Sequence, residues 1–248
     1  MQPCILSTFL FLIPLTAAFT VIRGNPTIPS QISVPRDFTD DPNSVYVDGG
    51  GFSGFWFLVG RLQSLPNPQD KTYHCVSAGA FGAVAALNNI TMDELYAKWS
   101  HVTSKWDNGV ITRHELVDNF ITELIYGDPV VETTRPLPSP RIDQSTLSRL
   151  NIITTVRDGW GLKHVSRTPG NMRELREMLL QTSWIPFVVG SGLWNMGHMD
   201  GGFSFFQHPK CAHTVRVRPD LDLLSNFLTV GLGRQKAEKY WKAGLEYA

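Results

Sequence analysis

The first third of the chain alternates short and long apolar segments, and this pattern predicts strands and helices in turn. Residues 44–47 form a short apolar run that predicts a buried strand. Residues 54–65 predict an apolar helix that ends before Pro66. Residues 72–76 predict a second strand, which leads directly into a small-residue helix over 78–88. The order strand, helix, strand, helix is typical of a parallel sheet with crossover helices.

The middle of the chain is predicted to be helical. Thr91 precedes two acidic residues and then apolar positions, which predicts a helix N-cap. Residues 112–125 place apolar side chains at helical spacing, namely Leu116, Phe120 and Leu124. Residues 133–140 hold three prolines and predict a loop or hinge.

A hairpin and an amphipathic helix are predicted next. Residues 150–156 are rich in β-branched side chains and predict a strand that pairs with 163–166 across a turn at Asp158-Gly159. Residues 171–182 predict an amphipathic helix. Its inward face is predicted to consist of Met172, Leu175, Met178 and Leu179.

The last part of the chain predicts two short strands and a final helix. Phe187-Val188-Val189 predicts a strand, after which a glycine-rich loop leads to Asp200. Residues 214–217 predict one more strand. The tail from Leu221 predicts a helix that docks on the sheet, with a membrane surface as the alternative. Its basic end consists of Arg234, Lys236, Lys239 and Lys242.

The N-terminal segment predicts a targeting sequence that is not part of the fold. Residues 5–22 are almost uncharged, and Thr16-Ala17-Ala18 offers a small-residue cleavage site, so residues 1–18 are predicted to be a signal peptide. An uncleaved membrane anchor is the alternative. No acidic residue precedes Asp37, and an extension to about residue 36 resembles the bipartite plastid presequences of algae with complex plastids. These interpretations predict the secretory pathway, the endomembranes, secretion or such a plastid as the location.

Composition predicts a single α/β domain over residues 37–248. The chain has 248 residues, of which 42% are hydrophobic, enough for one sizeable core. Lys plus Arg equals Asp plus Glu at 22 each, so the overall charge gives no basis for binding nucleic acid. Cys4 belongs to the targeting segment, and Cys75 and Cys211 alone make no disulfide framework.

Candidate chemistry lies in two small-residue turns that follow the first two predicted strands. The first, Asp48-Gly49-Gly50-Gly51-Phe52-Ser53-Gly54, presents bare backbone N–H groups, the donors that an oxyanion hole requires. The second, Cys75-Val76-Ser77-Ala78-Gly79, places a serine among small residues at a strand-to-helix turn, as in a nucleophile elbow. Together the turns predict acyl transfer at Ser77. The amides of Gly50 and Gly51 would hold the oxyanion, with Gly49 shaping the turn.

Residues 49–54 also match the dinucleotide-binding pattern G-x-G-x-x-G. That fold requires an acidic residue about 20 positions further on, at the end of a second strand. Asp70 has the spacing but lies in a proline-rich loop, and the second strand ends at Ser77 instead. Nucleotide binding is therefore disfavoured.

Asp200-Gly201-Gly202 supplies a candidate general base for Ser77. An aspartate can deprotonate a serine directly when burial raises its pKa. A Ser-His-Asp arrangement is the chemical alternative, and it would combine Ser77 with Asp158 or Asp200 and with His208 or His213. Too few residues precede Ser77 for that fold. His198 is predicted to face solvent.

A metal site is a further alternative near the C-terminal end. His208, Cys211 and His213 are close in sequence, but three such ligands without a matching partner group favour a surface loop over a metal site. No metal or organic cofactor is predicted.

In these motifs the sequence resembles the patatin-like phospholipases. Their pattern is a D-G-G-G-x-R-G loop, a G-x-S-x-G elbow and a later D-G-G or D-G-A, matched here by residues 48–54, 75–79 and 200–202. Residues 177–186 resemble the family's A-S-x-x-x-P region, so the resemblance spans roughly residues 45–203. It implies a three-layer α/β/α fold with a mostly parallel central sheet. It also implies a Ser77–Asp200 dyad without histidine that hydrolyses lipid acyl esters, with a membrane lipid or a lipid droplet as partner.

Two positions depart from the family pattern. Ser53 stands where the family has arginine, and Cys75 replaces the first glycine of the elbow. These departures favour a second hypothesis, a catalytically weak or inactive lipid-binding relative that keeps the pocket. A third hypothesis is a transacylase that uses the same site with an alcohol or lysolipid in place of water.

Overall fold

The computed structural model describes residues 37–127, 142–218 and 229–247. The chain divides into two compact units, residues 1–31 and 32–248, and every described residue belongs to the second. The predicted targeting segment, the predicted hinge and the first residues of the predicted C-terminal helix lie outside the described residues. Within the described ranges, no helix is both long and apolar enough to cross a membrane.

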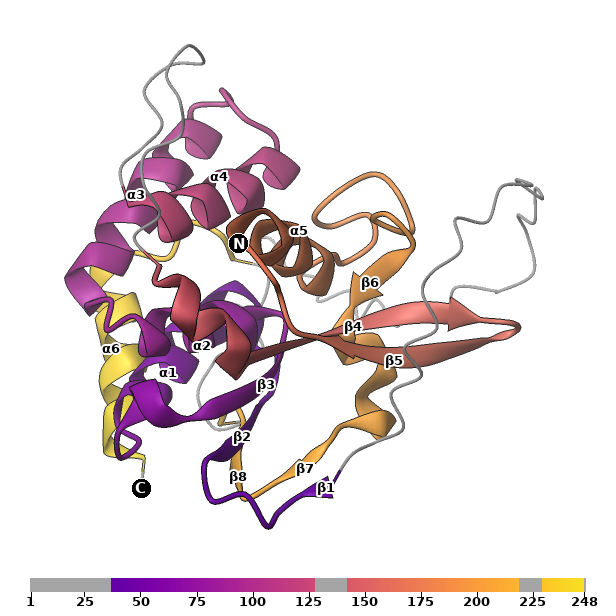
Figure 1. The fold of residues 1–248 in the computed structure, drawn as a ribbon. Helices are drawn as coiled ribbons and strands as arrows, with labels where there is room; N and C mark the ends of the chain where they lie inside the picture. Colours follow the sequence, from indigo (N-terminus) through magenta and orange to yellow (C-terminus); the bar gives the residue numbers. More distant parts are fainter. Residues whose placement is uncertain (1–36, 128–141, 219–228, 248) are drawn as a thin grey trace, which may run out of the picture. The chain divides into compact units, whose positions relative to one another are not determined.

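A mixed sheet in which parallel pairs dominate organises the described residues (Figure 1). Its strands are β2 (Ser44–Val47), β3 (Thr72–Val76), β4 (Leu150–Asp158), β5 (Gly161–Arg167), β6 (His198–Asp200) and β8 (His213–Val215). The order is β5-β4-β3-β2-β8, with β6 added on β4. Strands β8, β2, β3 and β4 are mutually parallel, whereas β5 and β6 run antiparallel to β4.

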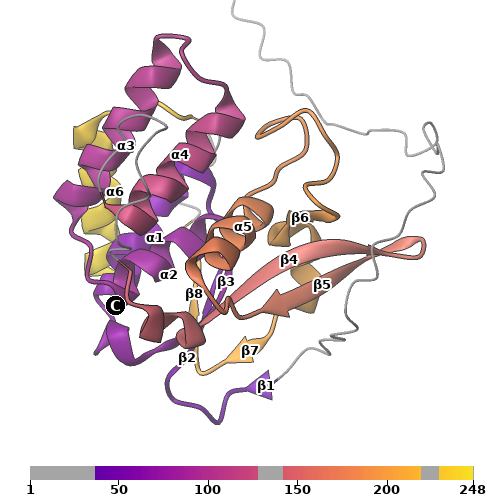
Figure 2. The same ribbon diagram turned by 45° about the horizontal axis from the view of Figure 1, so that its top comes forward.

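Helices lie over one face of this sheet (Figures 1 and 2). Those that contact its strands are α1 (Gly51–Gln63), α2 (Ala78–Leu87) and α5 (Met172–Thr182). Helices α3 (Met92–Asp107), α4 (Arg113–Tyr126) and α6 (Arg234–Glu246) pack on these helices and on one another. Alternate strand residues such as Val45, Cys75 and Ile152 are fully buried in one continuous core with these helices. This alternation follows from the two-residue period of a strand, which sends every second side chain to the same face.

The opposite face carries a thinner cover. Tyr46, Val76, Ile153 and Cys211 form a separate small cluster there. Its cover includes the 3-10 helix η3 (Gly201–Gln207) and the two-stranded sheet of β1 (Asp37–Phe38) and β7 (Lys210–Cys211). Two further 3-10 helices, η1 (Pro68–Asp70) and η2 (Gln144–Arg149), precede β3 and β4. The predicted α/β class with a mostly parallel sheet is confirmed, and the arrangement is compatible with three layers.

The structure confirms several predicted strands, helix caps and buried helix faces. Strands β2 and β3 have the predicted bounds. Thr91 forms the predicted cap, a full capping box with Glu94, and Thr112, which the sequence analysis did not single out as a cap, forms another with Glu115. The β4–β5 hairpin is confirmed, with both strands longer than predicted and the turn one residue later, at 159–160. The four predicted inward residues of α5 are buried.

Helix α1 begins at Gly51, three residues earlier than residue 54, where the sequence predicted it. Gly50 is the N-cap, and Gly51 takes φ 59°, a left-handed conformation that glycine adopts readily. The glycines therefore turn the chain from β2 into the helix through a loop of only three residues, 48–50. Ser53 lies inside this helix and is fully buried.

The strand predicted at residues 187–189 is wrong. The amides of Val188 and Val189 donate to the carbonyl of Ile185 at 3.1 and 3.0 Å, so they are used in a local turn. The strand that precedes the Asp-Gly-Gly motif is β6. Its three residues are too few to give an alternating pattern.

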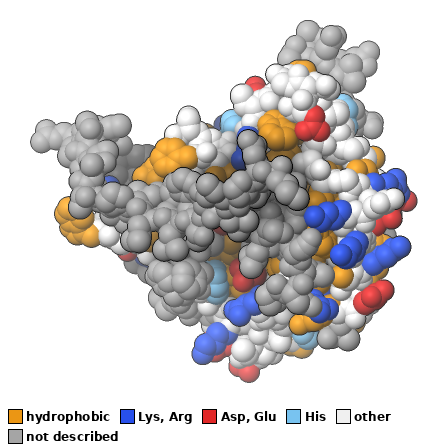
Figure 3. All heavy atoms as spheres, turned by 180° about the vertical axis from the view of Figure 1, so that it is seen from behind, with side chains coloured by type: hydrophobic (Ala, Val, Ile, Leu, Met, Phe, Trp, Pro, Cys, Tyr) orange, Lys and Arg blue, Asp and Glu red, His pale blue; other side chains and the backbone are white. Residues whose placement is uncertain are grey.

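Two corrections concern the C-terminal part. Strand β8 spans residues 213–215 instead of the predicted 214–217. Helix α6 begins at Arg234, and it packs on α1 instead of the sheet, with the Trp241 indole donating to Gln63 Oε1 at 2.9 Å. On the face opposite to that of Figure 1, basic and acidic side chains lie next to one another in the part that is not grey (Figure 3). Among the ion pairs of the described residues, Arg234 pairs with Asp93 and Glu238.

Candidate active site

The topology of β4 brings the two motif residues together. Strands β3 and β6 lie on the same edge of β4, end to end and in opposite directions. Val76 at the end of β3 pairs with Ile153, and Asp200 at the end of β6 pairs with Thr154, the next residue of β4. Ser77 follows Val76 directly, so the chain delivers Ser77 and Asp200 to one point.

Ser77 adopts the strained backbone of a strand-to-helix elbow. Its φ is 51° and its ψ is −129°, and it is the N-cap of α2. A Cβ atom on Gly79 would lie 2.5 Å from the Asp48 carbonyl oxygen, so this position requires glycine. A non-glycine residue held in such a conformation is typical of functional sites.

Cys75 fits the elbow despite replacing a glycine. It lies within β3, fully buried on the helix-covered face, with its Sγ 3.6 Å from the carbonyl oxygen of Asn151. Burial raises the pKa of the Cys75 thiol, so the group stays protonated and is not a competing nucleophile.

Thr182 is a residue of the candidate site that the sequence did not reveal. Its Oγ1 accepts the N–H of Ser77 at 2.9 Å and donates to the carbonyl of Ile153 at 2.5 Å. It is the last residue of α5 and fully buried, so it ties the elbow to both β4 and α5. We infer that Thr182 is a positioning residue for Ser77.

Replacing Thr182 by valine is expected to disturb the elbow. Valine leaves the Ser77 N–H and the Ile153 carbonyl buried without their partner, which destabilises the fold by about 1–3 kcal/mol for each group. We expect kcat to fall by roughly 10- to 100-fold with little change in KM, since substrate binding is not touched. Urea unfolding and ester hydrolysis measure both effects. Thr182→Ser retains the hydroxyl and should restore kcat, and an unchanged kcat in the valine variant would refute the positioning role.

Asp200 is a buried carboxylate in contact with Ser77. It is 6% exposed, and its Oδ1 accepts the N–H of Gly202 at 2.8 Å. Burial raises the pKa of Asp200 to about 6, an effect that Asp48 reinforces and that the Ser77 side chain and the Gly202 N–H oppose. A carboxylate with that pKa can take a proton near neutral pH.

The pKa of Asp200 predicts the pH dependence of any reaction in which this carboxylate acts as the general base of Ser77. A general base must be ionised, so kcat/KM is expected to rise with pH through a midpoint near 6 and to level off above it. His198, which lies two residues away, has a pKa lowered to about 4 by burial and so does not titrate in this window. A pH series with a soluble ester measures the profile. A flat profile between about pH 5 and 8 would contradict the role of Asp200.

The glycine loop, residues 48–51, lies directly against the elbow at Ser77. A Cβ atom on Gly49 would lie 3.2 Å from the Cβ of Ser77, so glycine lets the two turns approach closely. The N–H of Gly49 already donates to Asp48 Oδ1 at 2.9 Å, so it is not available to bind an oxyanion. Gly49 therefore shapes the turn, and Gly50 and Gly51 are left as the candidate donors of this loop.

Two helix N-termini converge beside Ser77. Gly51 and Phe52 at the start of α1 line the same cavity as Ser77 and Ala78 at the start of α2. The first N–H groups of a helix have no intrahelical acceptor, and the helix dipole makes that end positive. This geometry favours negative charge on an oxygen at Ser77.

Asp48 anchors the glycine loop. Besides the Gly49 N–H, its carboxylate accepts the Tyr46 hydroxyl at 3.3 Å and pairs with Arg216 at 3.7 Å. Its own N–H donates to the Val215 carbonyl at 3.0 Å, which ties the loop to β8. The carboxylate is thus occupied in structural contacts.

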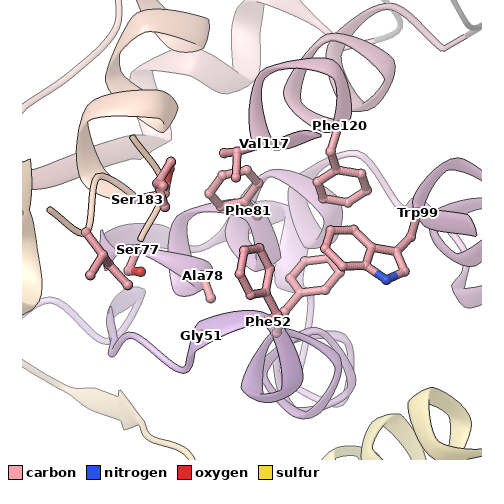
Figure 4. Close-up of a pocket in the computed structure, with 12 residues that line it drawn as sticks. Gly51, Phe52, Ser77, Ala78, Phe81, Trp99, Val117, Phe120 and Ser183 are labelled. Carbon is pink, nitrogen blue, oxygen red and sulfur yellow. The ribbon is translucent and has the colours of Figure 1, made fainter. Parts of the chain in front are cut away.

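An apolar cavity opens from Ser77 between the helices (Figure 4). Apart from Ser77, Ser183 and the backbone of Gly51, its lining is apolar: Phe52, Phe55, Ala78, Phe81, Trp99, Val117, Phe120, Ile185 and Val189. Ring contacts close its far end, with Trp99 5.1 Å from Phe120 and 5.7 Å from Phe52. The cavity measures about 60 Å³. Since one water-sized group needs roughly 10–15 Å³, about four to six such groups fit.

The histidines do not join this site. His198 is 6% exposed instead of facing solvent, because its pairing with β4 turns the ring inward, where Nδ1 lies 2.9 Å from Thr154 Oγ1. Asp158 is exposed at the hairpin turn, four residues along β4 from Thr154, the residue that pairs with Asp200. His208 packs against Tyr46 and His213 is exposed in β8, so neither histidine of the Ser-His-Asp alternative is placed as a base for Ser77.

The three residues His208, Cys211 and His213, which were predicted to share a surface loop, lie in different surroundings. His208 packs on the ring of Tyr46 at 4.7 Å, Cys211 is buried in β7, and His213 is exposed in β8. Across the residues that the structure describes, no three His, Cys, Asp or Glu side chains are grouped so that they could hold a metal ion.

Comparisons of the chain with protein-family models, with curated proteins and with solved structures gave no match. The functional interpretation therefore rests on the geometry of Ser77, Asp200, the two helix N-termini and the cavity.

Proposed function

We propose that the protein is a serine carboxylic-ester hydrolase that cleaves acyl esters through a Ser77–Asp200 dyad. The observation that carries this proposal is the juxtaposition of Ser77, strained at an elbow, and a buried Asp200, which the pairing of β3 and β6 with neighbouring residues of β4 delivers to one point. A serine hydroxyl is a poor nucleophile without an adjacent base, and this pair supplies one. The proposal includes a patatin-like three-layer α/β/α fold, with which the described mostly parallel sheet and its helices are compatible.

The chemistry proceeds in two halves. Ser77 Oγ attacks the ester carbonyl carbon while Asp200 takes its proton, and the carbonyl oxygen becomes an oxyanion near the amides of Gly50 and Gly51. The oxyanion collapses, the alcohol leaves with the proton from Asp200, and an acyl-enzyme remains. Asp200 then removes a proton from water, which attacks the acyl carbonyl carbon. The bond between that carbon and Ser77 Oγ breaks, Asp200 returns its proton to Ser77 Oγ, and the acid is released. An alcohol in place of that water would make the reaction a transacylation.

The cavity supports an acyl group as the part of the substrate that is bound. Its lining is apolar beyond Ser77, which favours a hydrocarbon chain and disfavours a charged head group. The proposed substrates are therefore lipid acyl esters, from a membrane or a lipid droplet. The chemistry needs no metal or organic cofactor.

Pre-steady-state hydrolysis of para-nitrophenyl butyrate tests this function. An acyl-enzyme predicts a burst of nitrophenol equal to the amount of protein, followed by slower turnover. A folded protein that releases no nitrophenol, and that binds lipid vesicles without freeing fatty acid, would exclude the hydrolase and favour a lipid-binding protein.

A further inference from the structure

The loop between α5 and β6, residues 183–197, lines part of the cavity and carries no charged side chain. It contains no Asp, Glu, Lys, Arg or His. Ile185 and Val189 line the cavity beside Ser77. In Figures 1 and 2 the loop extends from the end of α5 and returns to β6, the strand that ends at Asp200.

Three large apolar side chains of this 183–197 loop are exposed to solvent. Phe187 is 70% exposed, Leu193 51% and Met196 77%. Single exposed apolar residues are common on proteins, but three of them on one short uncharged segment indicate a contact surface. Phe187 lies between the two cavity-lining residues, so this surface adjoins the cavity.

The backbone of the loop is strained at two of these three residues. Phe187 has φ 61° and Met196 has φ 49°. The other described non-glycine residues with positive φ are two asparagines, which tolerate it, and Ser77 itself. Bulky residues rarely adopt a positive φ, and such backbone strain clusters at functional sites.

Contacts within the loop hold this conformation. The Trp184 indole N–H donates to the Gly192 carbonyl at 3.1 Å. Asn195 and His198 exchange backbone hydrogen bonds of 2.8 and 2.9 Å. These bonds fix both ends of the segment, so the exposed side chains project from a preformed loop.

We propose that the 183–197 loop docks on a phospholipid bilayer and inserts Phe187, Leu193 and Met196 below the head groups. Because the loop has no charged side chain, burying its tip in hydrocarbon desolvates no ion. An acyl chain is insoluble in water and must pass from the bilayer to the cavity that this loop borders. The purpose of the docking rests on the proposed function, whereas the docking itself does not.

Glycine substitutions test the docking without disturbing the loop. Phe187→Gly combined with Met196→Gly removes both side chains at positions where glycine prefers the observed φ, so the fold should be at least as stable. Sedimentation with phosphatidylcholine vesicles should show the affinity falling on the order of tenfold or more. Hydrolysis of soluble para-nitrophenyl butyrate should be unchanged.

Two control variants isolate the cause. Asn67→Gly relieves a positive φ of 48° at a position without an apolar side chain, and Val110→Ser removes an apolar side chain, 70% exposed, from the α3–α4 turn. Both should bind vesicles like the parent protein. The parent's binding should also persist at high salt, since no charge on the loop is involved.

Either of two results would overturn the docking: equal vesicle affinity of the double glycine variant and the parent, or loss of parental binding at high salt. The latter would assign binding to basic residues such as those of α6. The experiment distinguishes failure of the docking proposal from failure of the proposed function. If vesicle binding depends on Phe187 and Met196 but the protein has no esterase activity, the hydrolase proposal is rejected and the docking proposal stands.

Discussion

Ser77→Ala is expected to abolish ester hydrolysis, with kcat reduced on the order of 10⁵-fold or more. The reason is that alanine has no oxygen to form the acyl-enzyme, and residual rates come only from binding and the oxyanion donors. The fold should remain, because the backbone N–H of Ser77 keeps its bond to Thr182 and the lost hydroxyl lies at a cavity. Steady-state hydrolysis and urea unfolding measure the two effects.

Ser183 provides the matched control for this variant. It lines the same cavity, but its hydroxyl donates to the carbonyls of Leu179 and Leu180 at 3.0 and 3.2 Å within α5. Ser183→Ala should retain kcat within about tenfold. If Ser183→Ala lost activity while Ser77→Ala kept it, the nucleophile would have been misassigned.

Asp200→Asn is expected to lower activity and raise stability at the same time. The amide cannot take the proton of Ser77, so kcat should fall on the order of 10⁴-fold. The pKa of Asp200 is raised from 3.8 to about 6 in the folded protein. Its folded state therefore binds the proton more tightly than its unfolded state, and stability is lost as pH rises from about 4 through about 6.

A shift of roughly two pKa units corresponds to about 3 kcal/mol of free energy of unfolding. Asp200→Asn carries no charge, so at pH 8 it should be more stable than the parent by up to about this amount, with the difference shrinking toward pH 4. Asp158→Asn removes an exposed carboxylate and should change neither activity nor stability appreciably. An asparagine variant that is equally active, or less stable at pH 8 than at pH 4 relative to the parent, would contradict a buried ionised base.

The sequence predicts the parts of the fold that are decided locally. Thr91 and Thr112 cap helices through residues three positions away, so short motifs reveal them. Ser77 and the glycine loop each follow a strand that is readable as a short apolar run. Their positions after β3 and β2 could therefore be predicted from the residues that surround them, whereas their chemistry stays a prediction.

Features that depend on tertiary pairing could not be predicted in this way. Thr182 lies 105 residues from Ser77 in the chain, and its role exists only because α5 ends beside β4. The burial of His198 follows from the antiparallel pairing of the three-residue β6, which has no periodic signal of its own. Phe187 looked like part of a strand because its neighbours are β-branched, whereas the structure turns the chain there.

Covalent labelling of Ser77 is the most direct test of the proposed dyad. The protein is treated with a serine-directed fluorophosphonate, and the modified residue is located by mass spectrometry of peptides. The Ser77–Asp200 geometry predicts one adduct on Ser77, absent in Ser77→Ala and formed much more slowly in Asp200→Asn. A folded protein with no adduct, or with an adduct on another serine such as Ser183, would contradict Ser77 as the nucleophile.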